Sequence, residues 1–380
     1  MTTTKLYYEN AYTRTFEAEV LSCEEGKHGW EIVTDRTAFF PEGGGQTADT
    51  GTLGTVRVLD AHERDGAVVH YTDGPLSVGS TVTGRIDWDE RFRKMQNHSG
   101  EHILSGLVHA RYGYDNVGFR LTEEGCTIDF SGELTREQLN ELEYAANAVI
   151  WENRTITARF PSDEELKTLD YRSKLDLTEN VRIVTVEGVD VCACCAPHVS
   201  LTGEIGQLRI LDSMRHRGGV RLWVCSGSNA LLDARARYTA SAEISALLNK
   251  PQTDITEGVS ALLRQRDELR ADLTALQRQL SELRAASLPE TDGNLLLFEQ
   301  LDNDGMRTLV NAGMEKCGGV CAVFSGTDGA WQFVMGSAHF DMRPWLKELS
   351  KTLPVRGGGQ ERMVSGRCTA SRSEIEAALK

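Results

Sequence analysis

The first 88 residues alternate short hydrophobic runs with turn residues. Runs typical of β-strands cover residues 31–34, 55–59 and 68–71, and Gly or Asp-Gly turns separate them. Short strands divided by regularly spaced turns predict a small β-barrel. We therefore expect residues 1–88 to form an N-terminal β-barrel.

A helical pattern replaces this alternation after residue 88. Apolar residues and histidines recur at steps of three and four over residues 89–110, and a second helical face extends over residues 135–151. Strand-like stretches stand between and after these helices, at residues 126–130, 181–186 and 206–211. Residues 89–228 are therefore expected to form an α+β core.

A long helical tract follows in residues 229–288 and is broken at Pro251. Beyond the break, eight of nine positions at alternating steps of four and three are apolar, over about four heptads. This pattern predicts a coiled coil or a long helical hairpin arm, and a helix packed on its own domain is the alternative. Polar neighbours such as Arg264 and Gln265 argue against burial on all sides.

The last segment, residues 289–380, alternates strand and helix signals again. Strands are expected at residues 295–298, 320–324 and 331–335, and helices at residues 306–314, at residues 344–353 and from about Ser371. The glycines within residues 356–360 predict a loop. The predicted fold class is thus α+β, with a small N-terminal β-barrel, an α+β core, a coiled-coil or helical arm and a C-terminal α/β domain.

The net charge of −15 is unevenly distributed along the chain. Lys and Arg number 23 against 36 Asp and Glu in residues 1–227, but seven against three in residues 341–372. The acidic total argues against a simple coat on nucleic acid, whereas the basic stretch can hold a phosphate backbone. There is no secretory signal and no run of about 18 apolar residues. We therefore expect a protein of the reducing cytoplasm without a membrane segment, whose clustered cysteines bind metal before they form disulfides.

Two short clusters hold residue types that bind metals. His98 and His102 are four residues apart, which places both rings on one face of a helix, and Glu101 lies near the same face. Three cysteines and a histidine follow in the span 192–198, which its Gly, Asp and Pro neighbours mark as a loop. Together the clusters offer a nitrogen and sulfur set that suits tetrahedral zinc. The alternatives are a polar helix face, a purely structural zinc site and an inverted metalloprotease motif.

A third motif, F-F-P-E-G-G-G-Q at residues 39–46, precedes both clusters. Its consecutive glycines permit backbone angles closed to other residues and let a ligand approach the main chain, and a plain turn is the alternative. The order of this motif, then His-x-x-x-His, then Cys-x-x-x-His-Val resembles the editing domain of alanyl-tRNA synthetases and the free-standing AlaX trans-editing proteins. With its heptad tract and glycine-rich C-terminal segment, the chain resembles the long form of AlaX over essentially its whole length.

The resemblance implies a Zn²⁺ site in the editing core. The implied ligands are His98, His102, Cys194 and His198. Cys194 is chosen because it stands four residues before His198, and Cys195 and Cys192 are the fallbacks. The chain departs from the family at residues 195–197, where Cys-Ala-Pro replaces the usual Gly-Gly-Thr or Cys-Gly-Thr, and at Glu101, where synthetase editing domains often have Thr.

The implied activity is hydrolysis of the aminoacyl ester of mischarged tRNA(Ala), mainly Ser-tRNA(Ala) and also Gly-tRNA(Ala). Glu101 is the candidate base, since a carboxylate facing the pocket can take a proton. The candidate donors to the serine hydroxyl are Thr37, Gln46 and Asn116. The glycines expected to line the pocket or to hold the terminal adenosine are Gly43, Gly44 and Gly45. The rival hypothesis is a non-catalytic, zinc-containing tRNA-binding protein with the same fold.

The C-terminal glycine-rich segment carries a further resemblance, to the domain that alanyl-tRNA synthetases share with DHH phosphoesterases. The matching residues are Arg356, Gly357, Gly358 and Gly359, with Ser-Gly-Arg at residues 365–367. The Asp-His-His core of those phosphoesterases is absent, so we expect binding here and not phosphate hydrolysis. The resemblance implies recognition of the tRNA elbow around residues 356–372, and a structural turn is the alternative. A homodimer through the coiled coil or the C-terminal domain is the second candidate partnership.

Overall fold

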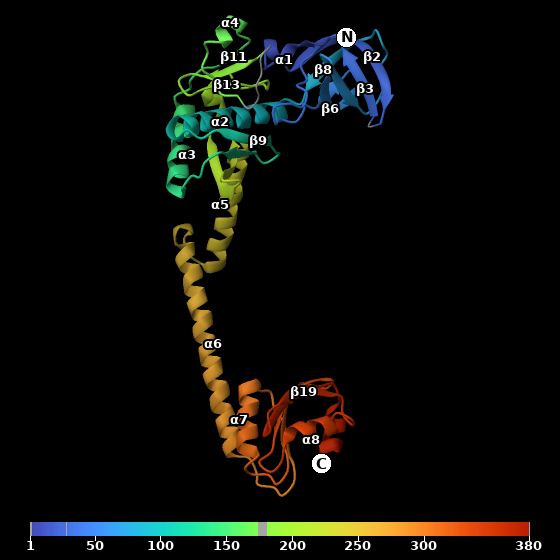
Figure 1. Cartoon of the computed structure of the whole chain (residues 1–380), viewed down its shortest axis with the longest axis vertical. Coiled ribbons are helices and arrows are strands. Elements are labelled where there is room, and N and C mark those ends of the chain that lie inside the picture. The colour runs from blue at the N-terminus through green and yellow to red at the C-terminus, as the bar shows by residue number, and fades with distance from the viewer. Residues whose placement is uncertain (1, 28, 174–180, 380) are drawn as a thin grey trace. The chain divides into compact units, whose positions relative to one another are not determined.

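The computed structural model describes residues 2–27, 29–173 and 181–379 (Figure 1). The chain forms two compact units, one spanning Met1–Ala240 and the other Ser241–Lys380. Helices and separate sheets occur together, which confirms the α+β fold class. Among the described residues, no helix combines the length and the apolar character that crossing a bilayer requires.

Six strands of the first unit close into a barrel, in the segment where the sequence predicts one. Their order around it is β2 (Thr15–Gly26), β3 (Gly29–Thr34), β7 (Ala67–Thr72), β6 (Val56–Arg64), β5 (Gly51–Leu53) and β8 (Thr81–Ile86). Successive residues of a strand face opposite sides, so alternate side chains such as Val20, Ile32 and Val58 fill the interior. The barrel is accompanied by the parallel pair β1 (Thr4–Lys5) and β4 (Arg36–Thr37), and by the short helix α1 (Leu6–Glu9).

The core of the first unit packs two helices, α2 (Trp88–Tyr112) and α3 (Arg136–Trp151), against an antiparallel sheet. The strand order is β14 (Leu208–His216), β15 (Gly219–Ser226), β10 (Cys126–Phe130) and β9 (Asn116–Leu121). A capping box formed by Thr135 and Gln138 begins α3, and Gly113 ends α2 in the left-handed conformation. Both helices form where the apolar spacing predicts them.

A second, three-stranded sheet brings the cysteine cluster next to α2. It consists of β11 (Ile156–Arg159), β12 (Ile183–Val186) and β13 (Asp190–Ala193), with the short helix α4 (Asp163–Leu166) after β11 and the 3-10 helix η1 (Thr202–Ile205) after the cluster. Gly106 of α2 permits the close approach, because a Cβ here would lie 2.6 Å from the carbonyl oxygen of Val189. The two clusters that the sequence separates by about 90 residues therefore meet.

A buried ion pair fastens the barrel to α2. Nε of Arg91 lies 2.8 Å from Oδ2 of Asp49, and Nη1 of Arg91 donates to the carbonyl oxygen of Ala11 at 3.0 Å. Asp49 also accepts the N–H of Phe40 at 2.6 Å, and so holds the start of the F-F-P-E-G-G-G-Q motif. Because both charged side chains are fully buried, the loss of one partner costs about 3–5 kcal/mol of stability.

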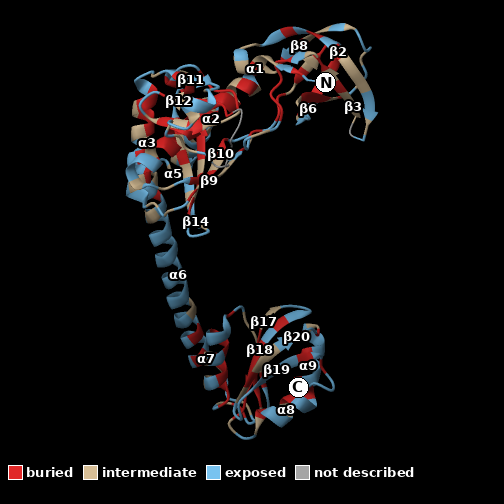
Figure 2. Ribbon diagram, turned by 45° about the horizontal axis from the view of Figure 1, so that its top comes forward, coloured by how far each residue is buried: buried red, intermediate tan, exposed pale blue. Residues whose placement is uncertain are grey.

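The helical tract consists of α5 (Ser228–Leu248), the 3-10 helix η2 (Gln252–Asp254) and α6 (Ile255–Ala286). The predicted break at Pro251 is confirmed, since α5 ends before it. Along α6 the heptad leucines form an exposed stripe, in which Leu262, Leu269 and Leu283 are 57%, 60% and 71% exposed. Figure 2 shows most of the α6 ribbon in the colour of exposed residues. Within the described part of a single chain these leucines have no packing partner that buries them, so the coiled coil stays a prediction.

A five-stranded sheet organises the second unit. Its order is β16 (Leu295–Phe298), β17 (Cys321–Thr327), β18 (Ala330–Gly336), β20 (Met363–Cys368) and β19 (Val355–Gly359), and its helices are α7 (Asn303–Gly313), α8 (Met342–Leu349) and α9 (Arg372–Leu379). The loop predicted within residues 356–360 is wrong, because residues 356–359 belong to β19, where Gly357 pairs with Gly366 of β20. Main-chain hydrogen bonds hold this strand in the sheet, although glycine has weak strand propensity.

Candidate metal centre and active site

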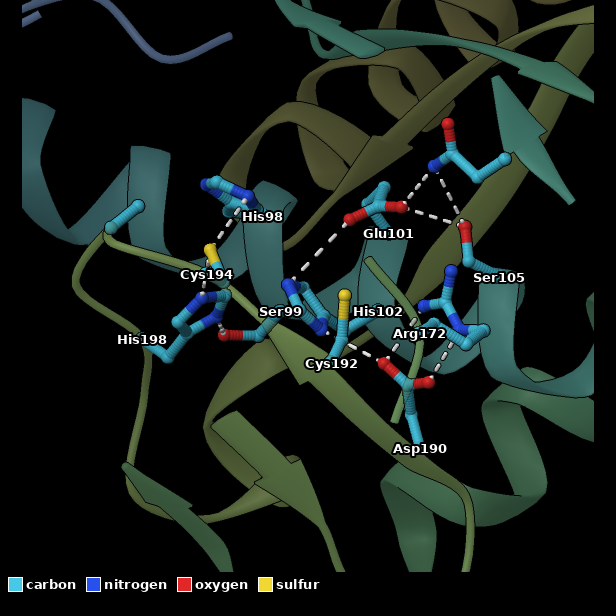
Figure 3. A network of polar contacts seen from close by, with 12 residues as sticks. His98, Ser99, Glu101, His102, Ser105, Arg172, Asp190, Cys192, Cys194 and His198 are labelled. Carbon is cyan, nitrogen blue, oxygen red and sulfur yellow. Dashed lines mark hydrogen bonds and ion pairs between the residues drawn. The ribbon is translucent and has the colours of Figure 1, made fainter. Parts of the chain in front are cut away.

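Four side chains converge where α2 meets the loop that follows β13 (Figure 3). α2 supplies His98 and His102, and the loop supplies Cys194 and His198, with all four ligand atoms within 4.8 Å of one another. Sγ of Cys194 lies 3.6 Å from Nε2 of His98 and 3.4 Å from Nε2 of His198. Tetrahedral zinc bonds of about 2.0–2.3 Å place ligand atoms roughly 3.3–3.7 Å apart, so this spacing suits one ion.

Each imidazole of the group is oriented by a further side chain. The pairs join Nδ1 of His98 to Oε1 of Gln46 at 2.9 Å, Nδ1 of His102 to Oδ2 of Asp190 at 2.9 Å, and Nδ1 of His198 to Oγ of Ser99 at 3.0 Å. With Nδ1 engaged in every ring, Nε2 is the nitrogen left to face an ion. Such partners fix the tautomer of a metal-bound histidine.

Arg172 extends this arrangement beyond Asp190. Its Nε and Nη2 donate to the two carboxylate oxygens of Asp190 at 2.7 and 2.9 Å (Figure 3). Burial raises the pKa of Asp190, but hydrogen bonds from His102 and Arg172 outweigh it and hold this pKa below its usual value. The Asp190 carboxylate is therefore charged when it accepts the hydrogen bond from His102. No motif in the sequence assigns a role to Arg172 or Asp190.

The charges around Cys194 favour its metal-binding form. Burial alone raises the pKa of this thiol, but the neighbouring His98 and the hydrogen bonds from His102 and His198 hold it well below its usual value. Burial lowers the pKa of His198 to about 3, so its ring is neutral. A thiolate and a neutral imidazole are the forms that bind metal.

The two fallback cysteines have other surroundings. Sγ of Cys195 would lie 3.3 Å from a Cβ at Gly44, and Cys195 packs against the cluster of Tyr7 and Phe40 beside the barrel. Burial raises the pKa of Cys195 to about 11. Cys192 belongs to a neighbouring group with the Asp190 carboxylate. Cys194 is therefore the cysteine that the structure places with three histidines.

The glycine-rich motif forms a tight turn that presents Gln46 to His98. Gly43 and Gln46 bond each other through both pairs of main-chain groups at 3.0 Å. Gly44 and Gly45 have φ of +59° and +81°, and a Cβ at Gly45 would lie 2.5 Å from the carbonyl oxygen of Phe119. Only glycine combines these angles with such a close approach. The turn is thus essential to the geometry around His98.

Glu101 is held at the edge of the ligand group. Its Oε1 accepts from Oγ of Ser105 at 2.6 Å and from Nδ2 of Asn116 at 2.5 Å. Its Oε2 lies 3.8 Å from Nε2 of His102 (Figure 3). Asn116, predicted as a donor to substrate, is thus placed as a partner of the Glu101 carboxylate.

Thr37 lies in a different place from the other candidate residues. Its hydroxyl is 2.8 Å from Nε2 of His70 and accepts the N–H of Phe39 at 3.1 Å. Nδ1 of His70 lies 3.0 Å from the carbonyl oxygen of Ile32, so this network belongs to the barrel interior. The structure does not bring Thr37 into the ligand group, because the alternation of residues turns it into the barrel.

A cavity of about 410 Å³ opens beside the ligand group. Gly44, Gly45 and Glu101 line it, as do the ligands His98, His102 and Cys194. The C-terminal candidates belong to the second unit, where Arg356 and the three glycines after it lie exposed on β19 and line a separate cavity of about 520 Å³.

Two family models match parts of this chain. The model for tRNA synthetases class II (A) matches residues 2–90, which include the barrel and the glycine-rich turn. The model for the threonyl and alanyl tRNA synthetase second additional domain matches residues 181–222, which include Cys194 and His198. The α2 histidines lie between the two matched segments.

The curated relatives share longer stretches. The alanine–tRNA ligase of Ignicoccus hospitalis is 33% identical over 70% of this chain and 31% of its own length, and that of Halobacterium salinarum is 32% identical over 88% and 38%. The chain thus spans about a third of the length of these ligases. The alanyl-tRNA editing protein Aarsd1 of Rattus norvegicus is 26% identical over 99% of this chain and 97% of its own.

These matches confirm the resemblance to the editing region of alanyl-tRNA synthetases. They also confirm the more particular resemblance to free-standing alanyl-tRNA editing proteins, since the match to the rat protein extends over nearly the whole of both chains. The segments that the synthetases and this chain share include the turn and the loop that supply Gln46, Cys194 and His198.

Proposed function

We propose that this protein is a zinc-dependent trans-editing hydrolase. It cleaves the ester between a wrong amino acid and the terminal ribose of tRNA(Ala), mainly in Ser-tRNA(Ala) and also in Gly-tRNA(Ala). The observation that carries the proposal is the buried group of three histidines and Cys194, in which every imidazole has a partner that orients it. The rat relative, an alanyl-tRNA editing protein, supports the same reaction class.

The donor set favours zinc among the common metals. Three imidazole nitrogens and one thiolate sulfur form a tetrahedral set of the kind that zinc prefers. When bound, zinc supplies a Lewis acid that polarises the ester carbonyl, or a positive centre that holds the amino or hydroxyl group of the substrate. Gln46, Asp190 and Ser99 keep the three rings in position for either task.

Glu101 is the proposed proton acceptor for the attacking water. Asn116 and Ser105 fix one of its oxygens at the wall of the cavity, next to the ligand group. As water oxygen bonds to the ester carbon, its proton passes to Glu101, and the bond from that carbon to the ribose oxygen breaks. The proton then goes to the departing ribose oxygen, which leaves the amino acid and the tRNA as products.

Gln46 is the best supported donor to the serine hydroxyl. Its Oε1 holds His98, while its Nε2 is buried and has no hydrogen-bond partner among the described residues. A buried donor that stays unpaired with alanine and is paired with serine discriminates strongly between the two. The hydroxyl of Thr37 and the amide of Asn116 are already engaged with His70 and Glu101.

The body of the tRNA is proposed to contact the second unit. Arg343 and Lys347 of α8 join Arg356 of β19 around the cavity of about 520 Å³, and three cations on one cavity suit phosphate groups. The exposed leucine stripe of α6 supports a homodimer through a coiled coil. A division into domains at 1–88, 89–228, 229–288 and 289–380 is our finer proposal within the two compact units.

The test is deacylation of Ser-, Gly- and Ala-tRNA(Ala). The wild type is expected to hydrolyse the first two faster than buffer and to spare the third, and His102→Ala is expected to fall to the buffer rate. His109→Ala is the matched control, since His109 belongs to the same helix, is 47% exposed and lies outside the ligand group. A wild type that is no faster than buffer would favour the non-catalytic tRNA-binding protein.

A further inference from the structure

The cavity beside the ligand group has a wall of aromatic rings. Tyr8 of α1, Phe119 of β9 and Phe160, which follows β11, line it together with Arg182. Phe160 is 50% exposed, so part of its ring is uncovered. Tyr8 and Phe160 meet edge to face, with centroids 5.3 Å apart and planes at 75°. The wall therefore offers a ligand an open aromatic surface.

Arg182 ties this wall to the loop that carries Cys194. Its guanidinium carbon lies 5.2 Å from the centroid of Tyr8, close enough for a cation–π contact. Its Nη1 also donates to the carbonyl oxygens of Cys194 and Ala196 at 3.0 and 2.8 Å. Tyr8 is therefore held at a fixed place relative to the ligand group.

Phe119 has a different role from the other two rings. The centroid of its ring lies 4.6 Å from that of the His98 ring, and Gly45 lies close to its carbonyl oxygen. Phe119 thus packs the metal centre itself. The aromatic rings that Tyr8 contacts are those of Tyr7 and Phe160, whereas Phe119 lies on a ligand histidine.

The acidic charge of residues 1–227 favours binding of the tRNA end by aromatic stacking. Residues 1–227 carry 23 Lys and Arg against 36 Asp and Glu, so the surrounding field repels a phosphate backbone. Stacking on an aromatic ring does not depend on net charge and accepts any base. An acidic core can therefore hold the end of a nucleic acid by stacking where attraction between charges fails.

We propose that Tyr8 and Phe160 bind the base of the terminal adenosine of the tRNA by stacking. The inference rests on the proposed function, because the ester to be cut lies on the ribose that carries this base, and the two must enter the cavity together. The glycine turn, the other place expected for the adenosine, uses the main-chain groups of Gly43 and Gln46 to close itself. The aromatic rings of the wall offer the base a stacking surface, which the glycines of the turn do not have.

The test uses binding rather than hydrolysis. Two labelled acceptor minihelices end in a non-hydrolysable seryl amide, one with adenine at the last nucleotide and one without a base there, and fluorescence anisotropy gives their Kd values for the full chain. Phe160→Ala is expected to weaken binding of the adenine probe roughly ten- to a hundredfold and to leave the abasic probe almost unchanged. Phe160→Tyr keeps the ring and should keep the affinity. Tyr144→Ala removes an aromatic that is 70% exposed on α3 and serves as the matched control.

Three results would overturn the inference: equal Kd values of the two probes for the wild type, an equal loss for both probes in Phe160→Ala, or no loss for either. Failure of the proposed function has a different signature. A protein that prefers the adenine probe and loses this preference in Phe160→Ala, yet hydrolyses no aminoacyl ester, supports the stacking site and contradicts the hydrolase.

Discussion

The polar residues near α2 and those on β19 differ in how they are held. His98, Glu101 and Asp190 are 2–5% exposed, and each has a hydrogen-bond partner that fixes its direction. Arg356 and the glycines after it lie exposed along an edge strand. Buried, oriented groups suit chemistry at one atom, whereas exposed groups suit contact with a large partner. We therefore propose that the first unit carries out the reaction and that the second unit contacts the tRNA.

The largest effect is expected from the cysteines of the ligand loop. Cys194→Ala should lower the zinc content from about one ion per chain to nearly none and abolish hydrolysis of Ser-tRNA(Ala), because it removes the only sulfur in the four-residue group. Cys195→Ala, one residue away, should retain its zinc. Metal analysis of the purified variants checks both. Equal zinc loss in the two variants would break the assignment of Cys194.

The second largest effect is expected from Asp190, which contacts His102 but is not one of the four proposed ligands. Asp190→Asn removes the charge that holds Nδ1–H of His102, and it should weaken zinc binding about 10- to 100-fold. Competition with a zinc chelator measures this affinity. Asp73→Asn changes an exposed carboxylate of the segment after β7, outside every group of potential metal ligands among the described residues, and is expected to leave the affinity unchanged. If both variants bind zinc like the wild type, the partner of His102 has no influence on the site.

A smaller effect is expected in the second unit. Replacing Arg343, Lys347 and Arg356 together by Ser should raise KM for Ser-tRNA(Ala) about tenfold at low salt, with kcat unchanged, because these cations are proposed to contact phosphates. The dependence of KM on salt should become weaker as well. Steady-state kinetics at several salt concentrations gives both quantities. A fall in kcat with constant KM would contradict the division of roles between the two units.

The smallest effect on activity is expected from His70, a buried histidine without a catalytic role. Burial lowers its pKa from 6.5 to about 4, so the folded protein keeps the ring neutral in a range where the unfolded chain takes up a proton. The stability it contributes is complete above about pH 6.5 and declines towards pH 4, by about 3 kcal/mol in total. His70→Gln should flatten the fall in Tm over this range. An unchanged slope would show that other groups cause it.

The elements that could be predicted from the sequence are those whose residues follow a regular local spacing. The helix of residues 88–112 follows from apolar spacing, and His98 with His102 follows from a step of four on that helix. The strand β19 was missed because glycines favour turns, and only the neighbouring strand β20 supplies the hydrogen bonds that hold them extended.

The partners of the ligands could not be predicted from local pattern. Asp190 reaches His102 across 88 positions of sequence, and Arg172 reaches Asp190 from a segment without a regular pattern. The first contact depends on how β13 lies against α2, and the second depends on the β-bridge that places Arg172 beside Cys192 of β13, so both are properties of the packed fold. The glycine-rich motif marks Gln46 as a candidate site residue. Its contact with His98 depends on the folded turn and could not be predicted from the motif.

The central claim is that a bound zinc ion makes this chain an editing hydrolase. The most direct test is the rate of Ser-tRNA(Ala) deacylation by the purified chain before zinc removal, after treatment with a chelator, and after the return of one equivalent of zinc. The proposed function predicts a fall to the buffer rate after removal and recovery on return, with Ala-tRNA(Ala) spared throughout. Full-rate hydrolysis by the zinc-free protein would contradict it.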